Sequence, residues 1–225
     1  MCNRFSASQW EAIRIYGKEI IPVLLRTKDD WADWLPKYNI PPTSRVPVIV
    51  NDQDAPRRLM SWGTQTNKGM VMNARSETLL EKSLWQQAAL VRRCVMLADG
   101  FFEWETIGRR KLGHYLSLKD RRPFAMAGVW FPVSDDQPER VVMVTNEPNA
   151  LVAPFHDRMP TILSLAAARE WLEIETIQQD DIVRLCRPYP VEEMNEWRSP
   201  PEMNSLAFQS PEALQPWKPE PDLFG

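Results

Sequence analysis

Short apolar segments of strand length, separated by polar turns, occupy the middle of the chain. Their length and their enrichment in Val, Phe, Tyr and Trp are typical of β-strands, and Gly, Asp, Asn or Pro punctuates the gaps. The expected strands cover residues 46–51, 59–63, 94–98, 101–107, 114–118, 124–131 and 140–145. Residues 108–111 form the basic tip of a hairpin in this interpretation.

Apolar residues recur at helical spacing elsewhere in the chain. The predicted helices cover residues 6–16, 29–35, 76–90, 150–155, 166–172 and 179–185. The prolines at 41 and 42 predict a rigid loop over residues 38–43, and the polar segment 64–69 is also expected to be a loop. Beyond Pro188 the chain is rich in proline and is expected to be irregular.

Helices and strands do not alternate strictly, which favours an α+β fold over a parallel α/β fold. We expect one domain over residues 1–215, built from curved, mostly antiparallel or mixed sheets of barrel-like form with flanking helices, and a tail over residues 216–225. The chain has 225 residues, of which 44% are hydrophobic and 25% charged, so it is long enough to bury a core.

Charge is distributed unevenly along the chain. Residues 171–225 carry 4 Lys and Arg against 11 Asp and Glu, whereas residues 1–170 carry 23 against 19. A polyanion would therefore meet a local basic patch on the first part of the chain. No apolar run approaches the ~18 residues of a membrane helix, and the N-terminus has no apolar h-region of a secretory signal. We expect a cytoplasmic monomer that makes no membrane contact.

The three cysteines, Cys2, Cys94 and Cys186, have no C-x-x-C spacing. This scattered, odd set argues against a disulfide framework or a zinc ribbon and suits a reducing compartment. No metal and no cofactor are expected. Cys94 lies in an apolar run, which indicates a buried, inert thiol.

Cys2 differs from the other two cysteines because a small residue after Met1 permits removal of the initiator methionine. Removal would leave an α-amine (pKa about 7.7–8.0) next to a thiol (about 8.5), both partly nucleophilic near neutral pH. Such an aminothiol can capture an aldehyde, first as an imine and then as a five-membered thiazolidine. A cysteine at position 2 is also compatible with chance.

Four short motifs stand in a distinctive order along the chain. They are Cys2-Asn3-Arg4-Phe5, Asn73-Ala74-Arg75-Ser76-Glu77, Ala98-Asp99-Gly100-Phe101-Phe102-Glu103-Trp104 and His156-Asp157-Arg158-Met159-Pro160. With Tyr38-Asn39-Ile40-Pro41-Pro42 and Met60-Ser61-Trp62-Gly63, this ordered set resembles the SOS-response-associated peptidase family, the abasic-site processing proteins. The resemblance covers roughly residues 2–210.

The resemblance implies a DNA-damage response protein whose N-terminal Cys2 forms a covalent thiazolidine crosslink with the aldehyde of an abasic site in single-stranded DNA. It also implies catalytic roles for three further residues. Glu103 would transfer protons during imine formation, His156 would act as a second acid or base, and Asn73 would position the Cys2 amine or the sugar. A solvent-facing glutamate and a structural histidine beside Asp157 are the alternatives for the first two.

Six residues are assigned to DNA binding by the same resemblance: Arg4, Asn39, Trp62, Arg75, Trp104 and Arg158. The arginines have planar forks suited to phosphates, and the tryptophans offer flat surfaces for unstacked bases. Salt-bridge roles for the arginines and core positions for the tryptophans remain open. His114 lies outside every motif and is interpreted as structural, and the basic run 109–111 is interpreted as a solvated turn.

The sequence departs from the family pattern at two places. Asn3 follows the cysteine where glycine is usual, and Thr64-Gln65-Thr66 follows Trp62-Gly63 where the family has apolar residues and a proline. Two other functions remain open. One is a cysteine peptidase that uses Cys2 as its nucleophile and Glu103 or His156 as its base, with its own Met1-Cys2 bond as the substrate. The other is a non-covalent single-strand binder that does not need Cys2. The resemblance also allows an abasic-site lyase activity in the crosslinking protein itself.

Overall fold

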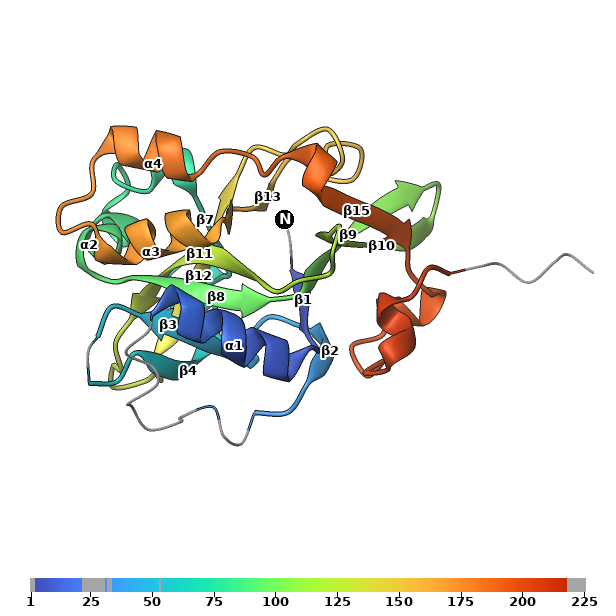
Figure 1. Ribbon diagram of the computed structural model, residues 1–225, viewed down its shortest axis with the longest axis horizontal. Coiled ribbons are helices and arrows are strands. Elements are labelled where there is room, and N and C mark those ends of the chain that lie inside the picture. The colour runs from blue at the N-terminus through green and yellow to red at the C-terminus, as the bar shows by residue number, and fades with distance from the viewer. Residues whose placement is uncertain (1–2, 22–30, 32–33, 53, 218–225) are drawn as a thin grey trace, which may run out of the picture.

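A closed ring of five strands forms the centre of the protein (Figure 1). The computed structural model describes residues 3–21, 31, 34–52 and 54–217. The ring strands are β3 (Arg45–Val50), β4 (Arg57–Trp62), β8 (Arg93–Ala98), β11 (Phe124–Phe131) and β12 (Arg140–Asn146). They pair in the order β12–β4–β3–β8–β11, and β11 pairs with β12 to close the ring. All of these pairs are antiparallel except β4 with β12.

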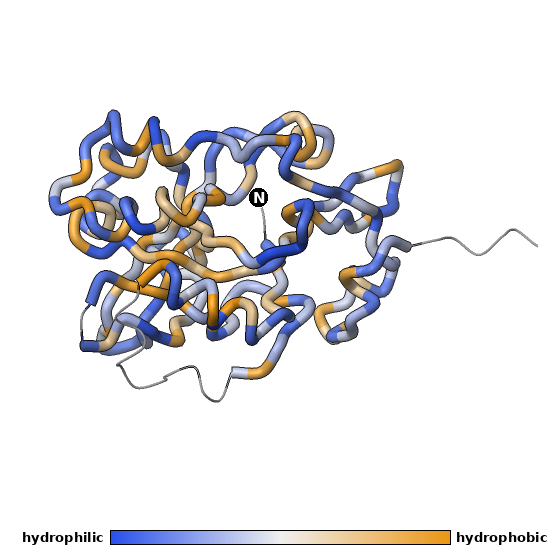
Figure 2. Tube along the Cα trace, in the orientation of Figure 1, coloured by the Kyte–Doolittle hydropathy of each residue, from blue (hydrophilic) through white to orange (hydrophobic). Residues whose placement is uncertain are grey.

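Short strands extend this ring. They are β7 (Asn73–Arg75) and β13 (Met159–Pro160), which pair with β12, and β14 (Ile162–Leu163), which pairs with β11. A separate small hairpin joins β5 (Thr64–Thr66) to β6 (Gly69–Val71). Hydrophobic residues concentrate in the ring strands, where every residue of β8 is buried (Figure 2).

A second sheet of five antiparallel strands carries the residues of interest. Its order is β15 (Met194–Arg198), β10 (Arg110–Leu118), β9 (Gly100–Ile107), β1 (Arg4–Ala7) and β2 (Lys37–Ile40). Only Asp99 separates β8 of the ring from β9 of this sheet. The two sheets are therefore joined rigidly at that point.

Four α-helices lie in the described part of the chain: α1 (Trp10–Ile20), α2 (Ser83–Val91), α3 (Leu165–Glu173) and α4 (Gln179–Leu185). Four short 3₁₀ helices are η2 (Ser76–Thr78), η3 (Val191–Glu193), η4 (Pro201–Asn204) and η5 (Pro211–Leu214). Figure 1 shows α2, α3 and α4 gathered at one end of the molecule and the β9–β10 hairpin at the other. Among the described residues, no helix has the length and apolar character needed to cross a bilayer.

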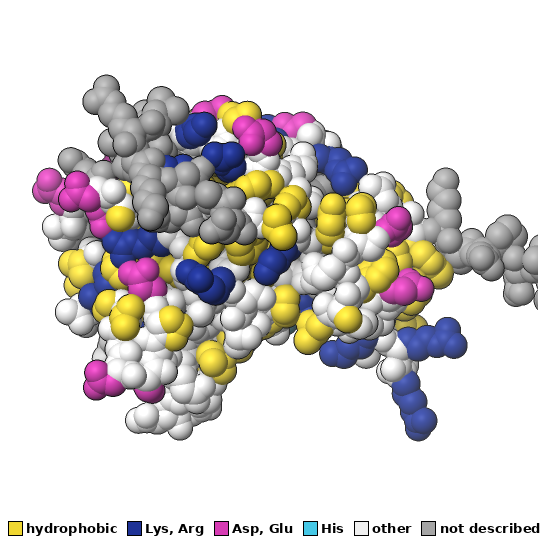
Figure 3. Space-filling model, turned by 90° about the horizontal axis from the view of Figure 1, so that it is seen from below, with side chains coloured by type: hydrophobic (Ala, Val, Ile, Leu, Met, Phe, Trp, Pro, Cys, Tyr) yellow, Lys and Arg dark blue, Asp and Glu magenta, His cyan; other side chains and the backbone are white. Residues whose placement is uncertain are grey.

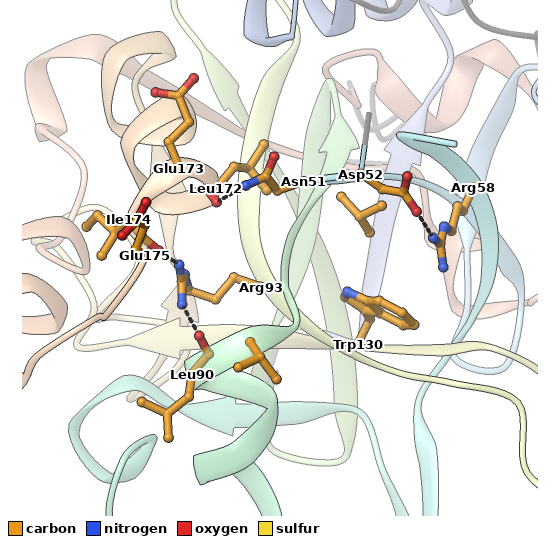
Figure 4. A pocket seen from close by; sticks show the side chains of 12 residues that line it. Asn51, Asp52, Arg58, Leu90, Arg93, Trp130, Leu172, Glu173, Ile174 and Glu175 are labelled. Carbon is orange, nitrogen blue, oxygen red and sulfur yellow. Dashed lines mark hydrogen bonds and ion pairs between the residues drawn. The ribbon is translucent and has the colours of Figure 1, made fainter. Parts of the chain in front are cut away.

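The buried Arg93 guanidinium fastens two helices to the ring. It donates hydrogen bonds to the carbonyls of Ala89 and Leu90 in the last turn of α2, and to those of Trp171 and Ile174 at the end of α3 (Figure 4). These are carbonyls that a helix C-terminus leaves without intrahelical partners, and a cation there also complements the helix dipole. The helical end of the molecule is thus stabilised through one side chain.

The buried carboxylate of Asp99 fastens the start of the chain. Its Oδ2 accepts the backbone N–H groups of Ser8 and Gln9 at 2.6 and 2.7 Å, and its Oδ1 accepts the Ser6 hydroxyl. Tyr115 donates its hydroxyl to the Asp99 carbonyl at 3.1 Å. Because the Tyr115 ring fills the space beside Gly100, a Cβ added at Gly100 would lie 2.2 Å from it. Asp99 and Gly100 therefore serve the fold, at the junction of the two sheets.

The predicted α+β class with mostly antiparallel sheets is confirmed. The predicted strands all occur, with ends that differ by a few residues, and the helix predicted over 179–185 is α4 itself. Ser164 caps α3 as its sequence position indicates, because its side chain accepts the Ala167 N–H. The helical turn predicted over 29–35 falls largely outside the described residues.

The prediction of a helix over 6–16 was wrong at both ends. Ser6 and Ala7 belong to β1, because Asp99 holds the backbone that follows them and β9 pairs beside them. The helix begins at Trp10 and continues through Gly17 to Ile20. Gly17 lies within this helix at a point of close packing. A Cβ added at Gly17 would lie 3.3 Å from the Ile49 side chain and 3.4 Å from the Leu97 side chain.

Two predicted loops contain strands. Residues 38–40 belong to β2, because the two prolines begin only after the segment that pairs with β1. Residues 64–66 and 69 belong to the β5–β6 hairpin. The irregular segment after Pro188 also contains a strand, β15, which pairs with β10 over five residues. Pairing with a distant strand supplies these backbone hydrogen bonds, and no local pattern signals it.

Two predicted helices were wrong in extent or type. The one over 76–90 is split into η2 and α2, with a turn between them. Residues 150–155 form turns, although Asn149 Oδ1 accepts the N–H groups of Leu151 and Val152 as a helix cap would. The Asn149 amide donates to the Tyr189 carbonyl at 2.8 Å and so fixes this loop to a distant segment.

Replacing Gly100 by alanine should destabilise the fold by at least about 2 kcal/mol, because the new methyl group overlaps the fully packed Tyr115 ring. Gly108→Ala is the matched control: it has φ +59° and open space around it, so it should cost only about 1 kcal/mol of backbone strain. Urea denaturation of both variants measures the difference. Equal costs would contradict the packing role of Gly100.

Candidate active site

A cavity of about 590 Å³ lies where β1, β9 and the loop before β13 meet. The residues that line it are Asn3, Arg4, Glu103, Trp104, Arg109, Lys111, His156 and Asn204. Four of these were predicted as site residues from the sequence: Arg4, Glu103, Trp104 and His156. The fold thus brings together residues from the first, third and fourth motifs. The cavity of Figure 4, near Arg93 and Trp130, contains none of the predicted site residues.

Glu103 is the buried acid of this cavity. Its side chain is only 3% exposed, and its Oε1 makes no hydrogen bond within the described residues. Burial raises the pKa of Glu103 to about 8, and the negative charge of Asp157 acts in the same direction. At neutral pH the carboxyl group is therefore protonated and can donate a proton.

His156 lies on the opposite wall, in the loop before β13. The backbone N–H of Arg158 lies 3.0 Å from its Nδ1, and Asp157 Oδ1 lies 2.7 Å from the same atom. The neutral ring accepts from Arg158 and carries its proton on Nε2, whereas an imidazolium can donate to Asp157. Burial lowers the pKa of His156 below its ordinary value. The neutral form therefore dominates at pH 7, beside a protonated carboxyl group.

Asn73 approaches the start of the chain from β7. Its buried amide nitrogen lies 3.5 Å from the side-chain oxygen of Asn3. Asn3 itself lines the cavity together with Glu103 and His156. Cys2, predicted as the nucleophile, lies outside the described residues, and its sequence neighbour Asn3 is the first residue that the structure describes.

Arg4 forms part of the cavity wall and is also held by other residues. Its guanidinium lies over the Trp104 ring, 5.3 Å from the centroid, and donates to Asn39 Oδ1 at 3.0 Å and to the Met203 carbonyl at 3.2 Å. Burial lowers the pKa of Arg4. Asn39 is fully buried, and its amide donates to the carbonyls of Ser205 and Phe208. In this structure Asn39 joins β2 to the C-terminal segment and presents no surface to a ligand.

Two other predicted DNA-binding residues point into the protein. Trp62 is fully buried, where it donates to the Met72 carbonyl at 3.1 Å and meets the edge of Phe5. Arg158 is buried in a two-pronged ion pair with Glu77, with N–O distances of 2.7 and 2.8 Å. Neither side chain is available to DNA in this arrangement. Arg75 differs from them because its side chain is exposed on β7.

Four cavity residues were not predicted as site residues from the sequence: Asn3, which lies in the first motif, and Arg109, Lys111 and Asn204. Arg109 and Lys111 come from the β9–β10 hairpin, and Figure 3 shows Lys and Arg side chains projecting at this end of the molecule. The basic run was visible in the sequence, although its position beside Glu103 was not. Nothing in the sequence indicated a site role for Asn204, which lies in η4. It accepts from Trp104 Nε1 at 2.9 Å and donates to the Lys111 carbonyl at 3.1 Å, which closes one side of the cavity.

Within the described residues, no three His, Cys, Asp or Glu side chains converge in a way that could hold a metal ion. Cys94 and Cys186 are buried free thiols, and burial raises the pKa of both. Neither lines the cavity. The chemistry that the described cavity offers is therefore proton donation by Glu103 and proton exchange by His156, beside basic side chains.

Comparison with known proteins identifies the family of this chain. The model of the family described as "SOS response associated peptidase (SRAP)" matches residues 1–206. The chain is 30% identical over 195 residues to the abasic site processing protein YoqW of Bacillus subtilis, covering 81% of this chain and 87% of that protein.

A second relative is the abasic site processing protein YedK of Escherichia coli, which is 30% identical over 190 residues and is matched over 78% of this chain and 81% of its own length. A crystal structure of a Bacteroides thetaiotaomicron protein shares the fold, with a TM-score of 0.80 at 22% identity, over 96% of this chain and all of that one. The chain belongs to the SOS response associated peptidase family.

Proposed function

We propose that this protein processes abasic sites in DNA by forming a thiazolidine crosslink between Cys2 and the aldehyde of the ring-opened sugar. The observation that carries the proposal is a protonated, buried Glu103 in a cavity that begins at Asn3, the residue directly after Cys2. The names of the relatives, which are abasic site processing proteins, support the same substrate.

The chemistry needs Met1 to be removed by hydrolysis, so that Cys2 carries a free α-amine. The amine adds to the aldehyde carbon and gives a carbinolamine. Glu103 then donates its proton to the carbinolamine oxygen, which leaves as water, and the nitrogen proton of the resulting iminium returns to the Glu103 carboxylate to give the imine. The Cys2 sulfur adds to the imine carbon, the thiol proton moves to nitrogen, and the five-membered ring closes. The net reaction releases one water molecule.

His156 and Asn73 have supporting roles in this proposal. A neutral imidazole can accept the sugar hydroxyl proton as the ring opens to the aldehyde, and can return a proton when the crosslink reverses. Asn73 can both donate and accept hydrogen bonds, which suits the positioning of an amine or a sugar hydroxyl. Its contact with Asn3 places it on the N-terminal side of the cavity.

Single-stranded DNA is the proposed partner because the acid lies below the surface. A nucleotide within a duplex would have to leave the base stack before its sugar carbon could reach Glu103, and a single strand avoids that cost. Arg109, Lys111 and Arg75 would meet the flanking phosphates, and the half-buried face of Trp104 lies where a neighbouring base would stack.

Peptide hydrolysis at Met1-Cys2 is the rival use of the same residues. Hydrolysis with Cys2 as the nucleophile needs a general base, whereas burial keeps Glu103 in its acid form. The structure therefore favours aldehyde capture as the main role of Glu103. Intact-mass measurement of Glu103→Ala protein separates the two. Retained Met1 in a host with working methionine aminopeptidase would indicate self-cleavage.

Incubation with a single-stranded oligonucleotide containing one abasic site should give a denaturation-resistant adduct, because the thiazolidine is covalent. Cys2→Ala should abolish it. Cys94→Ala and Cys186→Ala are matched controls, since both thiols are buried away from the cavity, and both should retain the adduct. Denaturing gel electrophoresis measures the product. Correctly processed wild-type protein that gives no adduct would rule the proposal out.

The rate of adduct formation should fall as the pH rises through about 8, because the acid form of Glu103 is lost there. Glu103→Gln should slow the reaction on the order of 100-fold and remove this alkaline limb. Single-turnover kinetics between pH 6 and 9 check it. An unchanged rate and profile in Glu103→Gln would show that Glu103 has no part in the chemistry.

The titration of Glu103 should also change the stability of the folded protein, so a measurement of stability tests the burial of Glu103 without DNA. The pKa of Glu103 is higher in the folded protein than in the unfolded chain. Its contribution to the free energy of unfolding is therefore fully present below the unfolded pKa of 4.5 and is lost as the pH rises through about 8. Glu103→Gln should therefore raise Tm at pH 8 on the order of 5 °C, with little change at pH 4.5. Thermal unfolding at both pH values measures this difference.

Arg109→Glu/Lys111→Glu should weaken binding to single-stranded DNA and reduce its salt dependence. Each lost phosphate contact lowers the slope of log K against log salt by about 0.7, so two should lower it by about 1.4. Lys82→Glu/Arg187→Glu carries the same charge change on the exposed surface near α2 and α4, and should leave the slope unchanged. Fluorescence anisotropy with the crosslink-deficient Cys2→Ala protein measures both. Equal slopes in the two variants would contradict the assignment.

A further inference from the structure

The second histidine of the chain lies beside the proposed acid. His114 is on β10, and the strand register puts it directly opposite Glu103 of β9 and Arg198 of β15. Side chains directly opposite in an antiparallel pair share one face of the sheet, with Cβ atoms about 4.5–5.5 Å apart. His114 is therefore an immediate neighbour of Glu103, although it does not line the cavity.

Carboxylates face both ring nitrogens of His114. Glu196 Oε1 of β15 lies 2.5 Å from Nδ1, and Glu105 Oε2 of β9 lies 3.5 Å from Nε2. The contact with Glu196 is a hydrogen bond, whereas Nε2 makes no hydrogen bond within the described residues. His114 is therefore held mainly through Nδ1.

The ring of His114 also supports the loop that carries His156. Phe155, the residue before His156, stacks on His114 with centroids 4.1 Å apart and an angle of 25° between the planes. His114 is 8% exposed, so this contact is largely dry. One side chain thus links the strand that carries Glu103 to the loop that carries His156.

The charged groups around His114 come from three elements. Glu103 and Glu105 come from β9, Glu196 and Arg198 come from β15, and His156 and Asp157 follow Phe155 in the loop. Three carboxyl groups share this face of the sheet. The outer two are paired with His114, whereas Glu103 Oε1 makes no hydrogen bond within the described residues.

We propose that His114 is a positioning residue of the cavity: its ring contacts Glu196 of β15 and packs the loop that carries His156 against the sheet. This inference rests on the proposed function for its catalytic consequence, while its structural consequence can be measured without DNA.

Two variants separate the ring stack from the polar contact. His114→Phe keeps the aromatic stack on Phe155 and removes the contact with Glu196. Glu196→Gln removes the carboxylate on the edge strand β15 and leaves the ring in place. Glu173→Gln, on α3 at the far end, is the matched control for the loss of one negative charge.

NMR of protein labelled at the histidine ring nitrogens follows the His156 ring directly, with His156→Gln to assign its signals. Displaced His156 signals in His114→Ala, and unchanged ones in His114→Phe and Glu173→Gln, are the expected result. His156 signals in His114→Ala that coincide with wild type would overturn the inference. This readout needs no DNA, so it is independent of whether an adduct forms.

The crosslinking assay then tests the link to the His156 loop. His114→Ala removes both the stack and the contact with Glu196, and should slow adduct formation about 10-fold with wild-type circular dichroism. His114→Phe, which retains the stack, should recover most of the rate. A rate in His114→Ala equal to wild type would overturn the positioning role. Absence of adduct in wild type would instead reject the proposed function, whatever the NMR result.

Discussion

The buried carboxylate of Asp99 fixes the position of the first strand relative to the two sheets. Asp99 stands between the ring and the second sheet, and a buried anion is tolerated only when hydrogen-bond donors surround it. Ser6, Ser8 and Gln9 supply those donors. The requirement to satisfy one charge therefore fixes β1 against β9. The cavity lies at the other end of this strand, where β1 begins at Arg4 beside Glu103.

The two faces of the second sheet have different roles: one packs against the C-terminal segment, and the other carries Glu103. Phe102 and Tyr115 lie on one face and pack with Met203 and Leu214 of the C-terminal segment. Glu103 lies on the other face, where the loop before β13 covers it and removes it from water. An acid at that position stays protonated chiefly because desolvation opposes its ionisation, and the negative charge of Asp157 acts in the same direction. The C-terminal segment thereby helps to hold the strand that presents the acid.

Local pattern was sufficient for the ring strands and for α4, because continuous apolar runs and capping residues are visible within a few positions. It failed for β2 and β15, whose strand character comes from pairing with distant partners. For the site, the motifs identified Glu103 and His156, which the fold places in one cavity. They could not show that Trp62 is buried in the core, because the sequence of a motif does not reveal whether its tryptophan faces a ligand or the interior.

The contact between Arg4 and the Met203 carbonyl spans 199 positions of sequence, which has a consequence for biosynthesis. A ribosome that adds roughly 5–20 residues per second needs about 10–40 s to pass from one residue to the other. The wall of the cavity is therefore absent for nearly the whole of translation. The nascent chain carries its first residues without the pocket that would direct their reactivity, and that pocket closes only after release of the C-terminal segment from the exit tunnel.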